Sequence, residues 1–381
     1  MNSSQKIALV CGHFIPNLGY IEVYLAKKMA QQNFDVCVFT SNKIPAYVST
    51  VADLNIEENA YQVKRLPAQF SKGQMVWSNN LTAEIKKFNP DKIIVIGVGK
   101  LFPYPVYKKF KHKEIITLFG DNVHNYNLKS GGMVVRFKQK ILDKIKNKVY
   151  RKALKISNKL IGYTPETEDL LLARFPEFKA EIQQKYRFVS LGFDDEIYYL
   201  NNSLREKTRN ELAIDQNTLV GITVTRFNKN KQIEKIVDFV GKLNQYQPVK
   251  YILLGAANDA YSKQIEQLIE KKKLQETIIL LPFEKDKSKI NALYNAADFG
   301  IWTQPAISVI EAKGTGLPVF LPREKSMQHL TLDNTGLFYT ELDNIFAQKC
   351  LQFMTEANRK QIANKNQWLN YREIVQQILN N

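Results

Sequence analysis

Hydrophobic residues in the first half of the chain form short continuous runs, and the segments between them have helical spacing. The runs are KIALVC (6–11), FDVCVFTS (34–41), NPDKIIVIGVG (89–99) and KEIITLFG (113–120). The segment IEVYLAKKMAQQ (21–32) has the period of an amphipathic helix. Continuous apolar strands are typical of a parallel sheet that is covered on both faces. The alternation of strand and helix therefore predicts a doubly wound α/β domain.

The same pattern starts again in the second half. It predicts strands at 217–227, 249–255, 277–283, 298–303 and 317–322, with helices at 231–243, 259–272, 287–296 and 307–314. With 381 residues, the chain is long enough for two domains. We therefore predict two doubly wound Rossmann-like domains, and such a pair places a ligand cleft at the carboxyl ends of its strands.

The predicted boundary lies in LGFDDEIYYL (191–200). We assign residues 1–195 to an N-terminal domain, 196–365 to a C-terminal domain, and 366–381 to a last helix that crosses back to the first domain. The segment KNQWLNYREIVQQIL (365–379) carries the helical pattern of that tail.

Charge is unevenly distributed along the chain. The 54 basic and 37 acidic residues leave a net charge of +17, and residues 1–195 hold 30 of the basic and 17 of the acidic ones. Hydrophobic residues make up 44%, which excludes a disordered chain. The excess charge indicates an anionic partner, which is a nucleic acid, a lipid surface or a phosphorylated ligand. Because no nucleic-acid recognition module is visible, we expect no nucleic-acid partner.

The basic charge is concentrated in residues 129–155. This stretch holds ten Lys and Arg and one acidic residue, Asp143. Apolar residues recur within it at helical spacing, at Val134, Phe137, Ile141, Ile145 and Val149. A basic amphipathic helix favours an anionic membrane surface. The alternative is a helix that packs on its own domain and keeps a solvated basic face.

Cysteine usage and hydropathy point to one compartment. The three cysteines are odd in number and far apart, which favours a reducing environment without disulfides. Cys11 and Cys37 fall in predicted strands and are expected to be buried. No 18 apolar residues run together, so we expect no spanning helix. The chain is predicted to be cytoplasmic, dissolved or peripheral on the cytoplasmic face of the membrane.

Three segments carry candidate chemistry. Gly19 lies between the first strand and helix, where backbone amides at a helix N-terminus suit a phosphate, although an ordinary turn fits equally. Arg226 ends a predicted strand and Lys231 opens the next helix, so the pair can clamp a diphosphate. Glu311 lies in a small apolar helix and could accept hydrogen bonds from a ribose, or be a partly exposed structural residue.

Taken together, these motifs resemble a known family. PNLGYIEVYLAKKM at the front, TRFNKNK in the middle, LYNAADFGIW (293–302), IEAKGTGLPVF (310–320) and NTGLFY (334–339) occur in the order and spacing of a family-4 retaining glycosyltransferase of the GT-B architecture. The resemblance covers nearly the whole chain. It implies sugar transfer from a nucleotide-diphosphate sugar, UDP- or GDP-linked, to a glycan or lipid-linked acceptor in the synthesis of cell-surface polysaccharide or glycoconjugate.

The resemblance also implies roles for individual residues. Arg226 and Lys231 match the residues that bind the donor diphosphate, and Gly19 matches a glycine-rich loop that approaches the donor. Glu311 matches the carboxylate that binds the ribose, with the helix start at Ile307 and Ser308 beside the diphosphate. His124 matches the histidine beside the transferred sugar, with Asp121 nearby, and a surface-loop histidine is the alternative. Thr303 stands where the family has a further Glu, which is a departure from the pattern.

No Asp-x-Asp triplet occurs in the chain, so we expect neither a metal site nor a cofactor. Arg226, Lys231 and a helix N-terminus would stabilise the diphosphate charge instead. Because Thr303 replaces a Glu, a catalytically weakened homologue that binds nucleotide-sugar as a partner subunit remains the alternative function.

Overall fold

The chain forms two compact units. The computed structural model describes residues 4–16, 20–45, 54, 60–72, 75–120 and 133–380, with the backbone alone for 133–142. Unit 1 comprises Met1–Leu191 and Tyr371–Asn381, and unit 2 comprises Gly192–Asn370. The limits expected from the sequence, after 195 and after 365, lie within five residues of these changes.

Unit 1 is built on a seven-stranded sheet in the order β3-β2-β1-β6-β7-β8-β9, and its neighbouring strands pair in parallel. The strands are β1 (Lys6–Cys11), β2 (Asp35–Ser41), β3 (Gln62–Leu66), β6 (Lys92–Ile96), β7 (Glu114–Phe119), β8 (Lys159–Gly162) and β9 (Tyr186–Phe188). A short antiparallel pair, β4 (Phe70–Lys72) and β5 (Met75–Trp77), lies outside this sheet. The doubly wound prediction is confirmed for this half.

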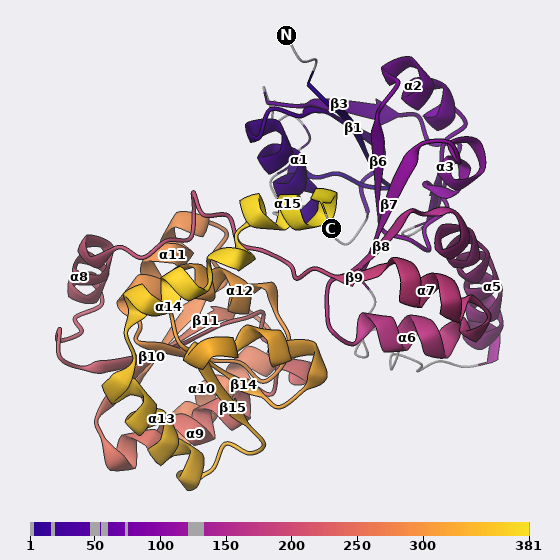
Figure 1. Cartoon of the computed structure of the whole chain (residues 1–381). Helices are drawn as coiled ribbons and strands as arrows, with labels where there is room; N and C mark the ends of the chain where they lie inside the picture. The colour runs from indigo at the N-terminus through magenta and orange to yellow at the C-terminus, as the bar shows by residue number, and fades with distance from the viewer. Residues whose placement is uncertain are drawn as a thin grey trace. The chain divides into compact units, whose positions relative to one another are not determined.

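Helices cover the sheet of unit 1 (Figure 1). They are α1 (Ile21–Gln31), α2 (Leu81–Phe88), α3 (Tyr104–Lys109), α5 (Met133–Ile156), α6 (Thr167–Arg174), α7 (Lys179–Lys185) and α15 (Tyr371–Asn380), with a 3-10 turn η3 (Pro176–Phe178). The last helix, α15, packs on α1, where the rings of Tyr24 and Tyr371 stack with centroids 4.7 Å apart.

The chain tail is more broken than its pattern predicts. Instead of one helix over 365–379, the structure has α14 (Arg359–Lys365), a 3-10 turn η7 (Gln367–Leu369) and then α15. The interruption coincides with the change from unit 2 to unit 1, where Phe193 N donates to the carbonyl of Leu369. The break therefore falls where the chain leaves one core for the other.

Unit 2 has a six-stranded parallel sheet in the order β12-β11-β10-β13-β14-β15. Its strands are β10 (Leu219–Val224), β11 (Val249–Ala256), β12 (Ile278–Pro282), β13 (Phe299–Ile301), β14 (Val319–Pro322) and β15 (Gly336–Tyr339). Its helices are α8 (Asn202–Glu211), α9 (Ile233–Tyr246), α10 (Ala260–Lys271), α11 (Lys287–Ala296), α12 (Ile307–Gly314), α13 (Asn344–Glu356) and α14, with 3-10 turns η4 (Lys229–Lys231), η5 (Lys325–Leu330) and η6 (Leu332–Asn334).

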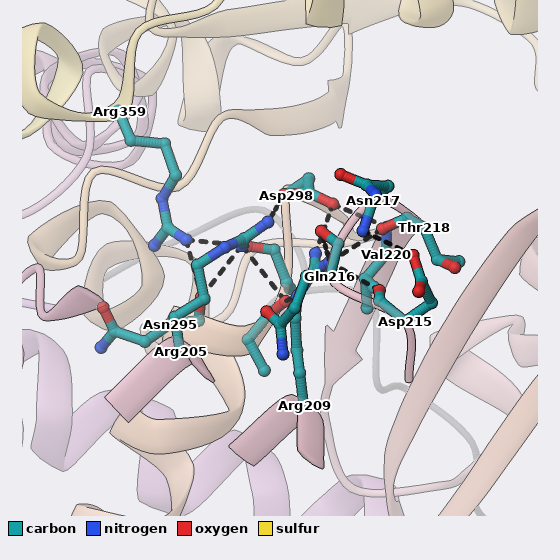
Figure 2. A network of polar contacts seen from close by, with 12 residues as sticks. Arg205, Arg209, Asp215, Gln216, Asn217, Thr218, Val220, Asn295, Asp298 and Arg359 are labelled. Carbon is teal, nitrogen blue, oxygen red and sulfur yellow. Dashed lines mark hydrogen bonds and ion pairs between the residues drawn. The ribbon is translucent and has the colours of Figure 1, made fainter. Parts of the chain in front are cut away.

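A buried ionic network holds the amino edge of this second sheet (Figure 2). Asp298, just before β13, accepts from Arg205 Nη2 at 2.5 Å and Arg209 Nη2 at 2.8 Å, and its Oδ2 also accepts from Val220 N at the start of β10. Arg359 of α14 donates to the carbonyls of Asn295 and Ala297 at the end of α11. The network thus joins α8, α11 and α14 to the sheet at its amino edge.

Helix α5 departs from its predicted role. Val149, which the apolar spacing places on a lipid-facing stripe, is 1% exposed and belongs to the core of unit 1 with Tyr150, Ala153 and Leu154. At this position the prediction is wrong, because Val149 packs in the hydrophobic core of its own unit. Residues 129–132, and the side chains of Val134, Phe137 and Ile141, lie outside the described part of the chain.

Candidate functional site

The candidate site lies at the carboxyl edge of the unit 2 sheet. The loops after β10 and β13 meet there, because these strands are parallel neighbours in the sheet. The predicted strand through Arg226 is too long, since β10 ends at Val224. Lys231 does not open α9 either. It ends the 3-10 turn η4, and α9 begins at Ile233.

One glycine allows the loop after β10 to lie close to the next strand. Gly255 at the end of β11 has φ +127°, and a Cβ built on it would be 1.8 Å from the carbonyl oxygen of Thr225. Phe227 N donates to the Gly255 carbonyl at 3.2 Å. A side chain at position 255 would therefore displace the segment that carries Arg226.

Two side-chain bonds join the loop after β10 to the loop after β13. Lys231 Nζ donates to the carbonyl of Pro305 at 3.3 Å. Thr303 Oγ1 donates to the carbonyl of Lys231 at 2.5 Å. Lys231, which sequence reasoning assigned to a diphosphate, is thus held directly beside the segment that leads into α12.

The start of α12 is fixed to β10. Ser308 Oγ donates to the carbonyl of Val224 at 2.6 Å and accepts from Trp302 Nε1 at 3.0 Å. Ile307 opens the helix with 42% of its surface exposed. The first amides of a helix have no acceptor within it and carry partial positive charge, so this terminus suits an anion.

The two cations of the loop differ in their surroundings. Lys231 is half-buried, and burial lowers the pKa of its ammonium group. Arg226 is exposed, and within the described residues its side chain makes no hydrogen bond or ion pair. A phosphate bound beside the two cations would supply Arg226 with the negatively charged partner that it lacks among the described residues.

Glu311 has a protein partner. Its Oε1 accepts from Lys287 Nζ at 2.8 Å, and its side chain is 8% exposed. Lys287 is the first residue of α11 and its side chain is 36% exposed. The structure thus joins Lys231 and Thr303 by a hydrogen bond, bonds Ser308 at the start of α12 to the end of β10, and places Glu311 one turn further along α12.

Three of the predicted residues cannot be placed. Gly19, Asp121 and His124 lie outside the described residues, so their assignments stay predictions.

Unit 1 has titratable groups at its own carboxyl edge that the sequence reasoning missed. The side chain of Lys100, after β6, lies close to Gly12 after β1 and to Gly97. Burial raises the pKa of Glu22 in the first turn of α1, and the nearby Lys100 opposes that rise. His13 is 6% exposed, and its Nδ1 lies 3.0 Å from the Lys43 carbonyl. For His13, the signal that would have found it is a polar residue close after a buried strand.

Other expectations concern metals, thiols and membrane spans. Within the described residues, no group of three or more His, Cys, Asp and Glu has metal-binding proximity. Cys11, Cys37 and Cys350 are buried and free, as predicted for the two strand cysteines. None of the helices in the described ranges is both long and apolar enough to cross a membrane.

Comparison with known proteins identifies a family that part of the chain resembles. Residues 204–367 match the family described as Glycosyl transferases group 1. This range contains the whole candidate site of unit 2. No curated protein matches the chain.

Solved structures share the fold over nearly the full length. A glycosyltransferase from Rickettsia africae is 15% identical, with a TM-score of 0.68 and coverage of 99% of both chains. HepE from Anabaena, solved in complex with UDP, is 17% identical, with a TM-score of 0.68 and 98% coverage of both chains. Sucrose-phosphate synthase from Thermosynechococcus elongatus is 19% identical, with a TM-score of 0.66 and coverage of 99% of this chain and 95% of the other. Residues 204–367 are therefore similar to glycosyl transferases group 1, within a chain that has the two-domain GT-B architecture.

Proposed function

We propose that the protein is a retaining glycosyltransferase that moves a sugar from a nucleotide-diphosphate sugar to a glycan or lipid-linked acceptor. The observation that carries this proposal is the arrangement at the carboxyl edge of unit 2. Lys231 and Thr303 join the loops after β10 and β13 beside the start of α12, and Arg226 is exposed on the same loop. This group supplies two cations and a helix N-terminus for one diphosphate.

The chemistry follows from the leaving group. As the bond between the anomeric carbon and the diphosphate oxygen breaks, negative charge grows on the diphosphate. Lys231, Arg226 and the amides at Ile307 and Ser308 would stabilise that charge without reorganising, because the loops that carry them are already bonded together. Glu311 would bind the ribose hydroxyls. Its carboxylate would then either release Lys287 or accept hydrogen bonds from Lys287 and the ribose together.

The donor assignment rests on chemistry and on likeness. HepE from Anabaena binds UDP, according to its solved complex, so UDP is the first nucleotide to test, followed by GDP. We further propose that the reaction needs no metal, that the enzyme works in polysaccharide or glycoconjugate synthesis, and that it works at the cytoplasmic face of the membrane.

The test is transfer from labelled UDP- and GDP-sugars in the presence of excess EDTA. We expect nucleotide release and a product that keeps the anomeric configuration of the donor. Complete loss of turnover in EDTA that is restored by magnesium or manganese would contradict the metal-independent mechanism. An inverted product would contradict retention.

One observation favours a second candidate function, a nucleotide-sugar-binding subunit with weak turnover. Thr303, at the position where the resemblance expects a Glu, carries no carboxylate, and its hydroxyl donates to the Lys231 carbonyl. The same assay separates the two functions. A binding subunit would bind UDP-sugar with ordinary affinity, but would neither hydrolyse nor transfer it under any acceptor condition.

A further inference from the structure

A basic hollow lies at the amino edge of the unit 1 sheet. Its volume is about 380 Å³. The turn between α5 and β8 contributes Ser157, Asn158 and Lys159, and the segment from α7 into β9 contributes Gln184, Lys185 and Arg187. Three of these six side chains are cationic and none is acidic. Such a lining favours an anionic ligand.

The positive charges crowd one another. The pKa of Lys159 is lowered chiefly by burial. Glu114 opposes this shift, and the charges of Lys92 and Arg187 reinforce it. Glu114 is the nearby carboxylate, but it lies closer to Lys92, at 3.1 Å, than to Lys159, at 3.9 Å. Among the described residues, Glu114 therefore faces both Lys92 and Lys159. Lys159 Nζ also donates to the Leu379 carbonyl at 2.9 Å, and a bound anion would still relieve the repulsion between the cations.

Lys185 offsets the partial negative charge at the end of α5, which would otherwise repel an anion. The hollow lies at the C-terminal end of α5, where unpaired carbonyls carry partial negative charge. Lys185 Nζ donates to the carbonyls of Leu154 and Lys155, at 3.4 and 3.1 Å. The ammonium group thus neutralises the helix end.

Arg187 offers the free donors. Its Nη1 donates to the carbonyls of Gln184 and Tyr186, at 3.1 and 2.7 Å. In the part of the chain that the structure describes, Nε and Nη2 have no partner. These two nitrogens form the side of the guanidinium group that binds two oxygens of one phosphate.

The position separates this hollow from the transferase chemistry. Ligands of doubly wound sheets bind at the carboxyl ends of the strands, whereas Lys159 opens β8 and Tyr186 opens β9 at the amino edge. The exposed residues in the described part of α5, which ends at this hollow, form a cationic row of Lys144, Lys148, Arg151 and Lys155.

We propose that this hollow is a second anion site, which binds a phosphate ester through Arg187, Lys159 and Lys185. The phosphate is carried by an anionic lipid headgroup or by a soluble phosphorylated molecule. The site does not depend on the function proposed for unit 2, and its test leaves nucleotide binding as a separate readout.

The test compares the full chain with two charge reversals in unit 1. Arg187→Glu removes the free guanidinium group. Lys111→Glu is the matched control, because Lys111 is exposed in the same unit and does not line the hollow. Binding of glycerol 3-phosphate is measured by calorimetry at fixed ionic strength. Flotation compares vesicles of phosphatidylglycerol with vesicles of phosphatidylcholine, and UDP affinity and melting temperature are recorded for each variant.

We expect Arg187→Glu to weaken glycerol 3-phosphate binding at least tenfold, while Lys111→Glu stays within twofold of the parent. If flotation with phosphatidylglycerol falls in the same selective way, the source is the lipid headgroup. If flotation is equal for the two variants, the site takes a soluble phosphate. The proposal is overturned if glycerol 3-phosphate fails to bind the parent, or if both variants bind it alike. UDP affinity is expected to stay unchanged in each case.

Discussion

Lys231 and Arg226 lie on one loop, and burial makes them unequal. Lys231 gives up hydration and is held by the Pro305 carbonyl, so its ammonium group is already in place for a diphosphate. Arg226 is exposed and must lose side-chain freedom when it binds. A pre-organised charge stabilises a transition state more than a mobile one, so Lys231 should contribute more than Arg226 to stabilising the leaving diphosphate.

We predict that Lys231→Ala lowers the transfer rate by about 10²–10³, and that Arg226→Ala lowers it by less. Lys229→Ala is the control, because Lys229 lies in the same 3-10 turn and is exposed. Steady-state kinetics at saturating donor measure the effect. If the Lys229 variant lost as much activity as the Lys231 variant, general charge and not placement would explain the result.

Glu311 needs a test that separates ribose binding from its ion pair with Lys287. Glu311→Gln removes a charge-assisted acceptor, which is worth about 1.5–3 kcal/mol, so UDP affinity should fall about tenfold or more. Lys287→Ala should lower stability by removing the partner of a buried carboxylate, but it should not weaken UDP binding. Titration calorimetry measures the UDP affinity of both variants, and melting curves measure their stability. An equal loss of UDP affinity in the two would mean that the pair acts as one structural unit.

At the scale of elements, Asp298 joins helix α8 to strand β10, and Arg209 of α8 donates to the Ala296 carbonyl at the end of α11 (Figure 2). The Arg209 side chain is fully buried, and burial lowers the pKa of its guanidinium group while Asp298 raises it. Arg359 is half-buried, and desolvation lowers the pKa of its guanidinium group to about 9. Asp298 is thus the carboxylate that forms ion pairs with both Arg205 and Arg209.

We predict that Asp298→Asn destabilises unit 2 by about 3–5 kcal/mol, because it leaves buried guanidinium groups without their counter-ion. Lys207→Ala, which breaks an exposed pair with Glu211 at 3.9 Å, should cost less than about 1 kcal/mol. Urea unfolding followed by the fluorescence of buried Trp302 reports on this unit. A small effect of Asp298→Asn would show that the carbonyl partners of the arginines suffice.

The sequence predicts the central elements well and the edges poorly. Strands β1, β2, β6 and β7 are continuous apolar runs because both of their faces are covered. Strand β3, at the edge of the sheet, reads QVKRL and has no such run. Strands β8 and β9 have only four and three residues, too few for a period to be recognised.

The candidate site follows the same division. That Arg226, Lys231 and Thr303 meet at one edge follows from the parallel order of the strands. The contact between Glu311 and Lys287 does not, because 24 residues separate them and the pairing depends on how two helices pack. Val149 shows a different kind of error. Helical spacing identifies the apolar side of the helix, but it does not say whether that side faces a membrane or the protein core, where Val149 is buried.

For the whole molecule, charge asymmetry and the burial of Val149 together change how a membrane would be bound. Unit 1 carries most of the excess charge, and the described part of α5 buries its apolar side in the core. Docking on an anionic leaflet by this part of the helix must therefore rely on its exposed cations, without insertion. Such binding weakens steeply with salt, because the Debye length is about 8 Å at physiological ionic strength.

We predict that Lys144, Lys148 and Lys155 together bind the leaflet. Each contributes roughly 1 kcal/mol, so replacing all three by Glu should lower partitioning into phosphatidylglycerol vesicles by about a hundredfold or more. Arg151 is left in place because it pairs with Glu177 at 2.8 Å. The control replaces three exposed helical lysines of unit 2, Lys207, Lys235 and Lys263, by Glu, which changes net charge equally. Flotation at low and at physiological salt measures both variants. Equal losses would mean that net charge alone drives association, and no loss in either would mean that α5 is purely an internal packing helix.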